Sequence, residues 1–86
     1  MRVRLPSLVD SYTGGLREVD LPAGDLAAVF AGLEARFPGV RFRLVDEHGR
    51  LRTHINVFVN ADAERDLSRP LRPGDQVMIV GALSGG

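Results

Sequence analysis

The last four residues are the part of this sequence whose types and spacing best suit chemistry. The chain ends in Leu83, Ser84, Gly85 and Gly86. Glycines lack a Cβ atom, so they can pass through a narrow cleft that a larger residue would block. An α-carboxyl group has a pKa of about 3.5, so at neutral pH it is an anion that can attack a phosphoanhydride. We therefore expect Gly86 to be activated in another protein's active site, which Leu83, Ser84 and Gly85 would enter with it.

Motifs for catalysis by the chain itself are absent from the sequence. It has no cysteine, and it lacks the G-x-S-x-G, H-E-x-x-H and phosphate-loop patterns. Its two histidines, His48 and His54, are too few for a zinc site made of protein ligands alone, and we interpret both as surface or structural residues. We therefore expect no catalytic residue, no metal site and no bound cofactor.

Composition and charge narrow the class of protein. A length of 86 residues suits one domain. The formal net charge is zero, which disfavours a protein dedicated to binding nucleic acid or an anionic membrane. The longest apolar run, residues 26–33, is far shorter than a membrane span of about 20 residues, and the first residues lack an apolar signal segment. We expect a cytoplasmic domain that binds neither nucleic acid nor membrane.

Period-two alternation of apolar residues predicts strands at residues 1–8, 16–21, 55–59 and 76–80. The turn-forming residues 11–15, with two glycines, would close the first two strands into a hairpin, and residues 70–75 predict a second tight turn. Residues 40–54 fit neither pattern clearly. Residues 61–69 are polar and predict a helix or a turn.

One amphipathic helix is predicted between the second and third strands. Asp25 is a good N-cap, and Pro38 with Gly39 marks the end. Apolar residues share an arc of about 100° on the helix, the width of a stripe that faces a core: Leu26, Val29, Phe30, Leu33 and Phe37. A single helix of this kind must cover one face of a mixed sheet, which predicts a two-layer α+β domain at residues 1–80. Residues 81–86 would then form a flexible C-terminal tail.

Four motifs point to a known family: YTGG at residues 12–15, INVFVN at 55–60, LRPGD at 71–75 and VMIVGALSGG at 77–86. With them the whole chain resembles the MoaD/ThiS family of ubiquitin-like sulfur carrier proteins. That family includes the small subunit of molybdopterin synthase and the carrier of a bacterial cysteine-synthesis route, to which the early TGG is most similar. The chain departs from the family at Gly81, where proline is common, and at Ser84, where alanine is common.

The resemblance implies a β-grasp fold, with a mixed sheet of four to five strands and one main helix packed on one face. It also implies a reaction cycle in which the chain is a carrier and not an enzyme. An E1-like enzyme would adenylate the Gly86 carboxylate with ATP and Mg²⁺, and a sulfur donor would convert the product to a thiocarboxylate. A synthase, either the large subunit of molybdopterin synthase or a cysteine synthase, would accept the tail and take the sulfur.

Two other functions are compatible with the same residues. The chain could be a ubiquitin-like modifier that is conjugated to other proteins through Gly86, or a non-catalytic β-grasp interaction domain.

The β-grasp resemblance also implies a docking patch. If Val57 and Ile79 face the helix, period two sends Phe58, Met78 and Val80 to the opposite face. In a β-grasp sheet the strands predicted at residues 55–59 and 76–80 are close enough for these three side chains to form one exposed apolar patch next to the tail. Such patches usually mark interaction sites. The alternatives are scattered surface hydrophobes, or burial under residues 40–54.

Overall fold

Residues 1–81 of the 86-residue chain are described by the computed structural model. The elements along these residues are β1 (Arg2–Arg4), the 3-10 helix η1 (Ser7–Val9), α1 (Asp10–Thr13), β2 (Glu18–Asp20), α2 (Leu26–Arg36), α3 (Val40–Leu44), β3 (Ile55–Val59), β4 (Asp62–Ala63) and β5 (Gln76–Gly81).

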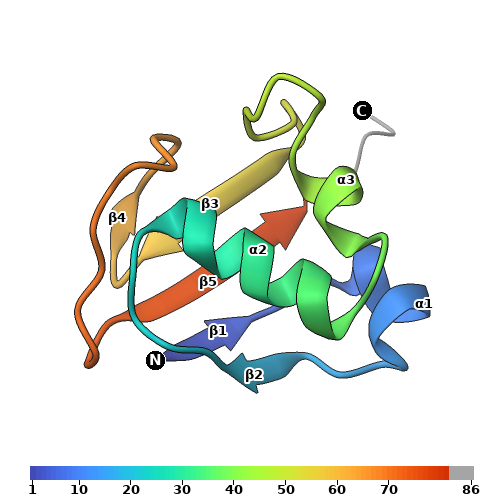
Figure 1. The fold of residues 1–86 in the computed structure, drawn as a ribbon, viewed down its shortest axis with the longest axis horizontal. Helices are drawn as coiled ribbons and strands as arrows, with labels where there is room; N and C mark the ends of the chain where they lie inside the picture. The colour runs from blue at the N-terminus through green and yellow to red at the C-terminus, as the bar shows by residue number, and fades with distance from the viewer. Residues whose placement is uncertain (82–86) are drawn as a thin grey trace.

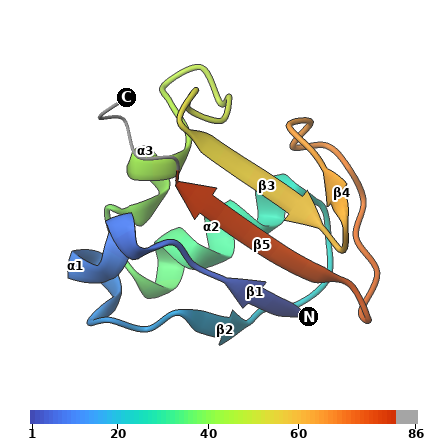
Figure 2. The ribbon, with the colours of Figure 1, turned by 180° about the vertical axis from the view of Figure 1, so that it is seen from behind.

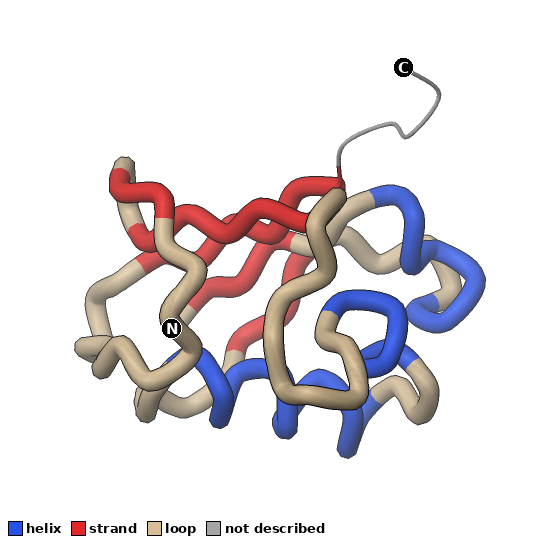
Figure 3. The backbone as a smooth tube through the Cα atoms, turned by 90° about the horizontal axis from the view of Figure 1, so that it is seen from above, coloured by secondary structure: helices blue, strands red, loops and turns tan. Residues whose placement is uncertain are grey.

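The five strands form one mixed sheet in the order β2-β1-β5-β3-β4, so the last strand lies in the centre. β5 pairs parallel with β1 and antiparallel with β3, while β2 and β4 are antiparallel edge strands. Helix α2 crosses one face of this sheet (Figure 1), and no helix of residues 1–81 crosses the face that is turned to the viewer in Figure 2. Seen from above, strands and helices form two layers (Figure 3). The predicted α+β architecture with a mixed sheet is confirmed.

The core lies between α2 and the sheet. The side chain of Asp25 caps the helix as predicted, since its Oδ1 accepts a hydrogen bond of 2.8 Å from the amide of Ala28. Four of the five predicted helix residues are buried: Leu26, Val29, Phe30 and Leu33. Their sheet partners in the core include Val3, Ile55, Val57, Val59, Val77 and Ile79.

Phe37, the last residue of the predicted stripe, packs against the core but is only partly buried. It is the C-cap of α2, with φ of −133° and ψ of 81°, outside the helical region. The cause is Pro38, because a residue that precedes proline is disfavoured in helical geometry. The helix therefore ends at Arg36, in agreement with the stop that Pro38 and Gly39 predict.

The ambiguous segment begins with a short helix, α3. The carboxylate of Glu34 accepts hydrogen bonds from the amides of Gly39 (2.8 Å) and Arg41 (2.9 Å) at its start. These bonds, the one from Gly39 above all, lower the pKa of Glu34. Val40 and Leu44 are fully buried one turn apart, whereas the side chain of Phe42 is exposed on the other side of the helix. In the sequence these three apolar residues alternate with arginines, a pattern typical of a strand, and the pattern therefore did not indicate a helix.

The first strand is shorter than predicted. Residues 1–8 were expected to be extended, but β1 ends at Arg4 and the chain then turns through η1 and α1. Pro6 precedes η1 and lacks the N–H group that a further ladder bond would need. Gly14 and Gly15 have φ of +66° and +87° and form the predicted turn, and β1 pairs with β2 as the predicted hairpin.

Strand β4 was not predicted. Residues 61–69 were expected to be a helix or turn, yet Asp62 and Ala63 pair with the end of β3. Both residues are exposed, so this edge pairing is made by backbone groups and leaves no apolar alternation in the sequence.

The last strand runs through Gly81, one residue further than predicted, and Gly81 is the register partner of Ile55. A Cβ atom on Gly81 would collide with the side chain of Leu8 from η1. Leu8 is partly buried and packs against the core. Leu8 thus occupies the space beside the strand end, which explains the glycine at this position.

Replacing Phe30 with alanine should lower the free energy of unfolding by about 3–5 kcal/mol, because the ring is completely buried between α2 and the sheet. Phe42→Ala is the matched control. Its ring is 58% exposed, and its loss should cost less than about 1 kcal/mol, the size of an exposed cation–π contact. Chemical denaturation measures both. A Phe30→Ala cost below about 1 kcal/mol would contradict this packing.

Gly81→Ala should lower the free energy of unfolding by about 1–3 kcal/mol, because the added methyl group overlaps Leu8. In a Leu8→Ala background that space is open, so the same substitution should cost much less. A double-mutant cycle read by thermal or chemical denaturation gives the coupling between the two positions. Equal costs in both backgrounds would show that Leu8 is not what excludes the methyl group.

Candidate functional site

The predicted docking patch lies on the sheet face that no helix crosses. Phe58 and Met78 are direct register partners across β3 and β5, and Val80 follows Met78 by two residues on the same side. Met78 is 37% exposed, and Phe58 and Val80 are half-buried. The strand pattern therefore brings the three predicted residues together on one face, as expected.

Residues 40–54 do not cover this patch. Apart from the exposed Phe42, their apolar side chains belong to the core on the other side of the sheet: Val40, Leu44, Val45 and Leu51. Figure 2, which views the sheet from the patch side, shows α3 behind and beyond the end of β5. The alternative in which this segment buries the patch is thereby removed.

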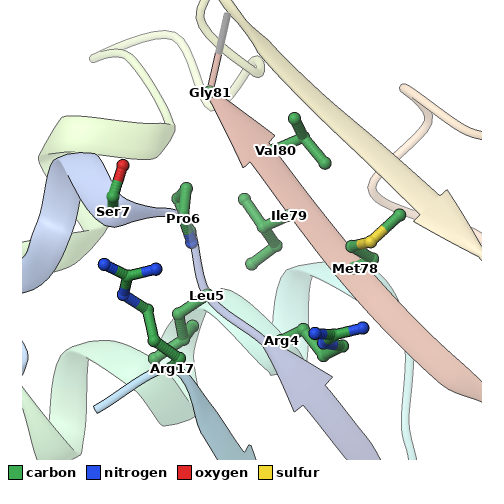
Figure 4. Close-up of a pocket in the computed structure, with 9 residues that line it drawn as sticks. All are labelled: Arg4, Leu5, Pro6, Ser7, Arg17, Met78, Ile79, Val80 and Gly81. Atoms are coloured by element: carbon green, nitrogen blue, oxygen red, sulfur yellow. The ribbon is translucent and has the colours of Figure 1, made fainter. Parts of the chain in front are cut away.

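A depression of about 270 Å³ adjoins the patch at the end of β5. It is lined by Arg4, Leu5, Pro6, Ser7, Arg17, Met78, Ile79, Val80 and Gly81 (Figure 4). The exposed Arg4 is the register partner of Met78 in the parallel pairing of β1 with β5, so a cation stands directly beside the patch.

Arg17 is held in place by Asp10. Its Nε and Nη2 atoms donate hydrogen bonds of 2.8 and 2.9 Å to the two oxygens of the Asp10 carboxylate. The hydrogen bond and the charge of Asp10 raise the pKa of the Arg17 guanidinium. The titratable side chains that line the depression are Arg4 and Arg17. Both donate hydrogen bonds and stay protonated. This depression can hold an anionic or apolar group of a partner, but it offers no general base.

The predicted tail residues Leu83, Ser84, Gly85 and Gly86 lie outside the described residues. The structure describes the chain up to Gly81, which is the last residue of the central strand β5.

Residues of the YTGG motif and of the polar segment 61–69 have structural roles. The hydroxyl of Thr13 donates a 3.1 Å hydrogen bond to the carbonyl of Leu16, and the ring of Tyr12 lies against Gly39, so the YTGG motif closes α1 onto the start of α3. The side chain of Arg65 donates to the backbone carbonyls of Ile55 (2.7 Å) and Arg52 (3.0 Å). His48 is exposed in a turn, as predicted.

Arg4 is the residue near the patch that sequence reasoning missed. The alternation of residues 2–5 places Arg4 on the polar side of its strand, and nothing local indicates which strand it will face. The parallel pairing of β1 with β5 joins residues more than 70 positions apart and supplies that information. Within residues 1–81, no three histidine or carboxylate side chains lie where they could hold a metal ion, and no helix is long and apolar enough to cross a membrane.

Comparison with known proteins gives relatives over nearly the full length. No family model matches the chain. The sulfur carrier protein CysO of Mycobacterium tuberculosis is 34% identical over 89 aligned positions, which cover 98% of this chain and 96% of that protein. The structure of the Amycolatopsis orientalis BexX/CysO complex contains a chain with a TM-score of 0.87 and 30% identity, covering 99% of this chain and 98% of that one.

A further structural relative is a modifier. SAMP1 of Haloferax volcanii has a TM-score of 0.79 and 26% identity, covering all of this chain and 98% of that one. Its identity is lower than that of the CysO proteins, so the carrier is favoured over the modifier. These neighbours also confirm the β-grasp fold. The chain belongs to the family of ubiquitin-like sulfur carrier proteins that includes CysO.

Proposed function

We propose that this sulfur carrier holds its sulfur as a thiocarboxylate on Gly86 and delivers it in cysteine biosynthesis. The observation that carries the proposal is the similarity to CysO proteins along nearly the whole chain. The TGG at residues 13–15, which is most similar to the cysteine-route carrier, supports the same pathway.

The chemistry proceeds in two steps on the terminal carboxylate. A carboxylate oxygen of Gly86 attacks the α-phosphorus of ATP in an E1-like enzyme, which forms an acyl-adenylate and releases pyrophosphate. Hydrosulfide (HS⁻) released by a sulfur donor then attacks the carbonyl carbon, displaces AMP and loses its proton, which leaves the thiocarboxylate. ATP and Mg²⁺ belong to the activating enzyme, and the carrier is its co-substrate. Because the first step consumes ATP, we place the cycle in the cytoplasm.

The carrier then docks on a synthase that takes the sulfur. A chain of this fold is part of a complex with a second protein in the BexX/CysO structure, which supports a docking role for the fold. For this chain we propose Phe58, Met78 and Val80 as the docking patch, because they form an apolar group on the open sheet face beside the end of β5. Methionine and aromatic side chains suit a surface that must fit more than one partner.

Removal of residues 85–86 should abolish activation and leave the fold intact. The buried apolar side chains of the described residues end at Ile79, so the truncated chain should melt within about 2 °C of the full chain. Adenylation is measured by the ATP–pyrophosphate exchange of the activating enzyme. The full chain should stimulate exchange, and the truncated chain should leave it at background. Equal stimulation by both chains would contradict the proposal.

Phe58→Asp together with Met78→Asp should weaken docking without disturbing the core. Loss of the side chains at the centre of an interface costs about 2 kcal/mol or more of binding free energy. The apparent KM of the activating enzyme for the carrier should therefore rise about 30-fold. The matched control is Ala31→Asp with Ala35→Asp, which places the same charges on the exposed side of α2. The control should keep its KM within about twofold. A folded patch variant with an unchanged KM would show that docking occurs elsewhere.

A further inference from the structure

A second surface, distinct from the docking patch, lies at the same end of the molecule as Gly81. Four side chains line a depression of about 320 Å³: Phe42, Arg43, Arg52 and His54. They come from α3 and from the segment that leads into β3. We call this group the α3 surface.

The aromatic ring of the α3 surface is held outside the core. Phe42 is 58% exposed, more than the other exposed large hydrophobic residues among residues 1–81. Arg52 fixes its position, since its Nε donates a 2.7 Å hydrogen bond to the carbonyl of Phe42 and its guanidinium carbon lies 4.6 Å from the ring centroid. Val40 and Leu44 already fill the core side of α3, so the fold does not need an apolar side chain at position 42.

The charge of the α3 surface is positive, although the chain as a whole is neutral. Its lining holds two arginines and one histidine and no carboxylate. Among residues 1–81, carboxylates lie within 4 Å of Arg2, Arg17 and Arg69, and none lies within that distance of Arg43 or Arg52. The nearby Asp46 accepts hydrogen bonds through its Oδ1 from the amides of Arg50 (3.0 Å) and His48 (2.9 Å), and the charge of Arg52 also contributes to lowering the pKa of its carboxyl group.

The α3 surface adjoins the strand end from which the tail continues. The carbonyl of Arg52 accepts a 3.0 Å hydrogen bond from the amide of Ile55, and Ile55 is the register partner of Gly81. Figures 1 and 2 both show α3 next to the end of β5. An active site that receives the residues after Gly81 must therefore approach this end of the molecule.

We propose that the α3 surface is a second contact for the activating enzyme, which presents an acidic side chain together with an apolar one beside its tail-binding cleft. The carboxylate would bind between Arg43 and Arg52, whose guanidinium groups suit it geometrically, and the apolar side chain would pack on Phe42. Charge complementarity argues for this partner, because two arginines that have no carboxylate within 4 Å among residues 1–81 flank an exposed ring. The inference rests on the proposed function, since it takes for granted that an enzyme receives the tail.

Arg43→Glu tests this contact most cleanly. The residue is exposed, and its side chain makes no hydrogen bond or ion pair within residues 1–81, so the variant should fold normally. We expect the apparent KM for the carrier in ATP–pyrophosphate exchange to rise about tenfold at low salt, and the difference to shrink as salt screens the charges. Arg72→Glu is the matched control. It makes the same change of charge in the exposed turn before β5, at the far end of that strand, and should stay within about twofold of wild type.

A second pair of variants tests the ring. Phe42→Ala should raise the KM about fivefold, whereas Leu16→Ala, which also removes an exposed apolar side chain, should leave it unchanged. Equal KM values for Arg43→Glu and Arg72→Glu, with a wild-type chain that is adenylated, overturn the inference and leave the proposed function standing. A wild-type chain that is not adenylated overturns both. Dimerisation of the wild type that Arg43→Glu abolishes would show that the occupant is a second copy of this chain, which also overturns the inference.

Discussion

The pairing of β5 on both of its edges is the interaction on which the rest of this structure depends. β1 bonds to it in parallel and β3 in antiparallel fashion, so the last strand of the chain is also the central one. Neither edge is left open to solvent or to another strand. In the proposed cycle, other proteins bind the residues that follow this strand. Because β5 is hydrogen-bonded on both sides, its end is held within the sheet. The side chain of Leu8 occupies the space beside Gly81, the last residue of the strand.

The period of two in the same strand links the core to the proposed docking patch. Val77 and Ile79 point into the core against α2, so Met78 and Val80 must point to the open face. A shift of register by one residue would exchange the two sets, burying the patch and exposing the core. The parallel neighbour then adds a cation, because Arg4 is aligned with Met78. One backbone pairing therefore fixes the core, the patch and the charge beside it.

The sequence predicted the elements with long periodic patterns and clear boundaries. Helix α2 has four buried apolar positions at helical spacing, a capping Asp25 and a stop before Pro38, and strands β3 and β5 alternate over five or more residues. Shorter elements were missed for physical reasons. α3 has one helical turn, too few residues to separate a period of 3.6 from a period of 2, and β4 is held by backbone bonds between exposed residues.

The candidate site divides in the same way. The grouping of Phe58 with Met78 could be predicted, because the family resemblance gives the order of the strands and alternation gives the face. The position of Arg4 beside them and the depression around Phe42 depend on contacts between distant segments, which no local pattern records. The function came from the resemblance and is confirmed by the CysO relatives, whereas the role of Gly86 stays a prediction.

The most direct test of the account is the intact mass of the carrier after incubation with its activating enzyme, Mg²⁺, ATP and a sulfur donor. The account predicts a mass gain equal to the exchange of one oxygen atom for one sulfur atom, located by fragmentation in the peptide that contains Gly86. It also predicts no gain when ATP is omitted or when residues 85–86 are removed. An unchanged mass would contradict the account, provided that the same enzyme preparation activates a carrier that is already known to be its substrate. A sulfur atom located elsewhere in the chain would also contradict it.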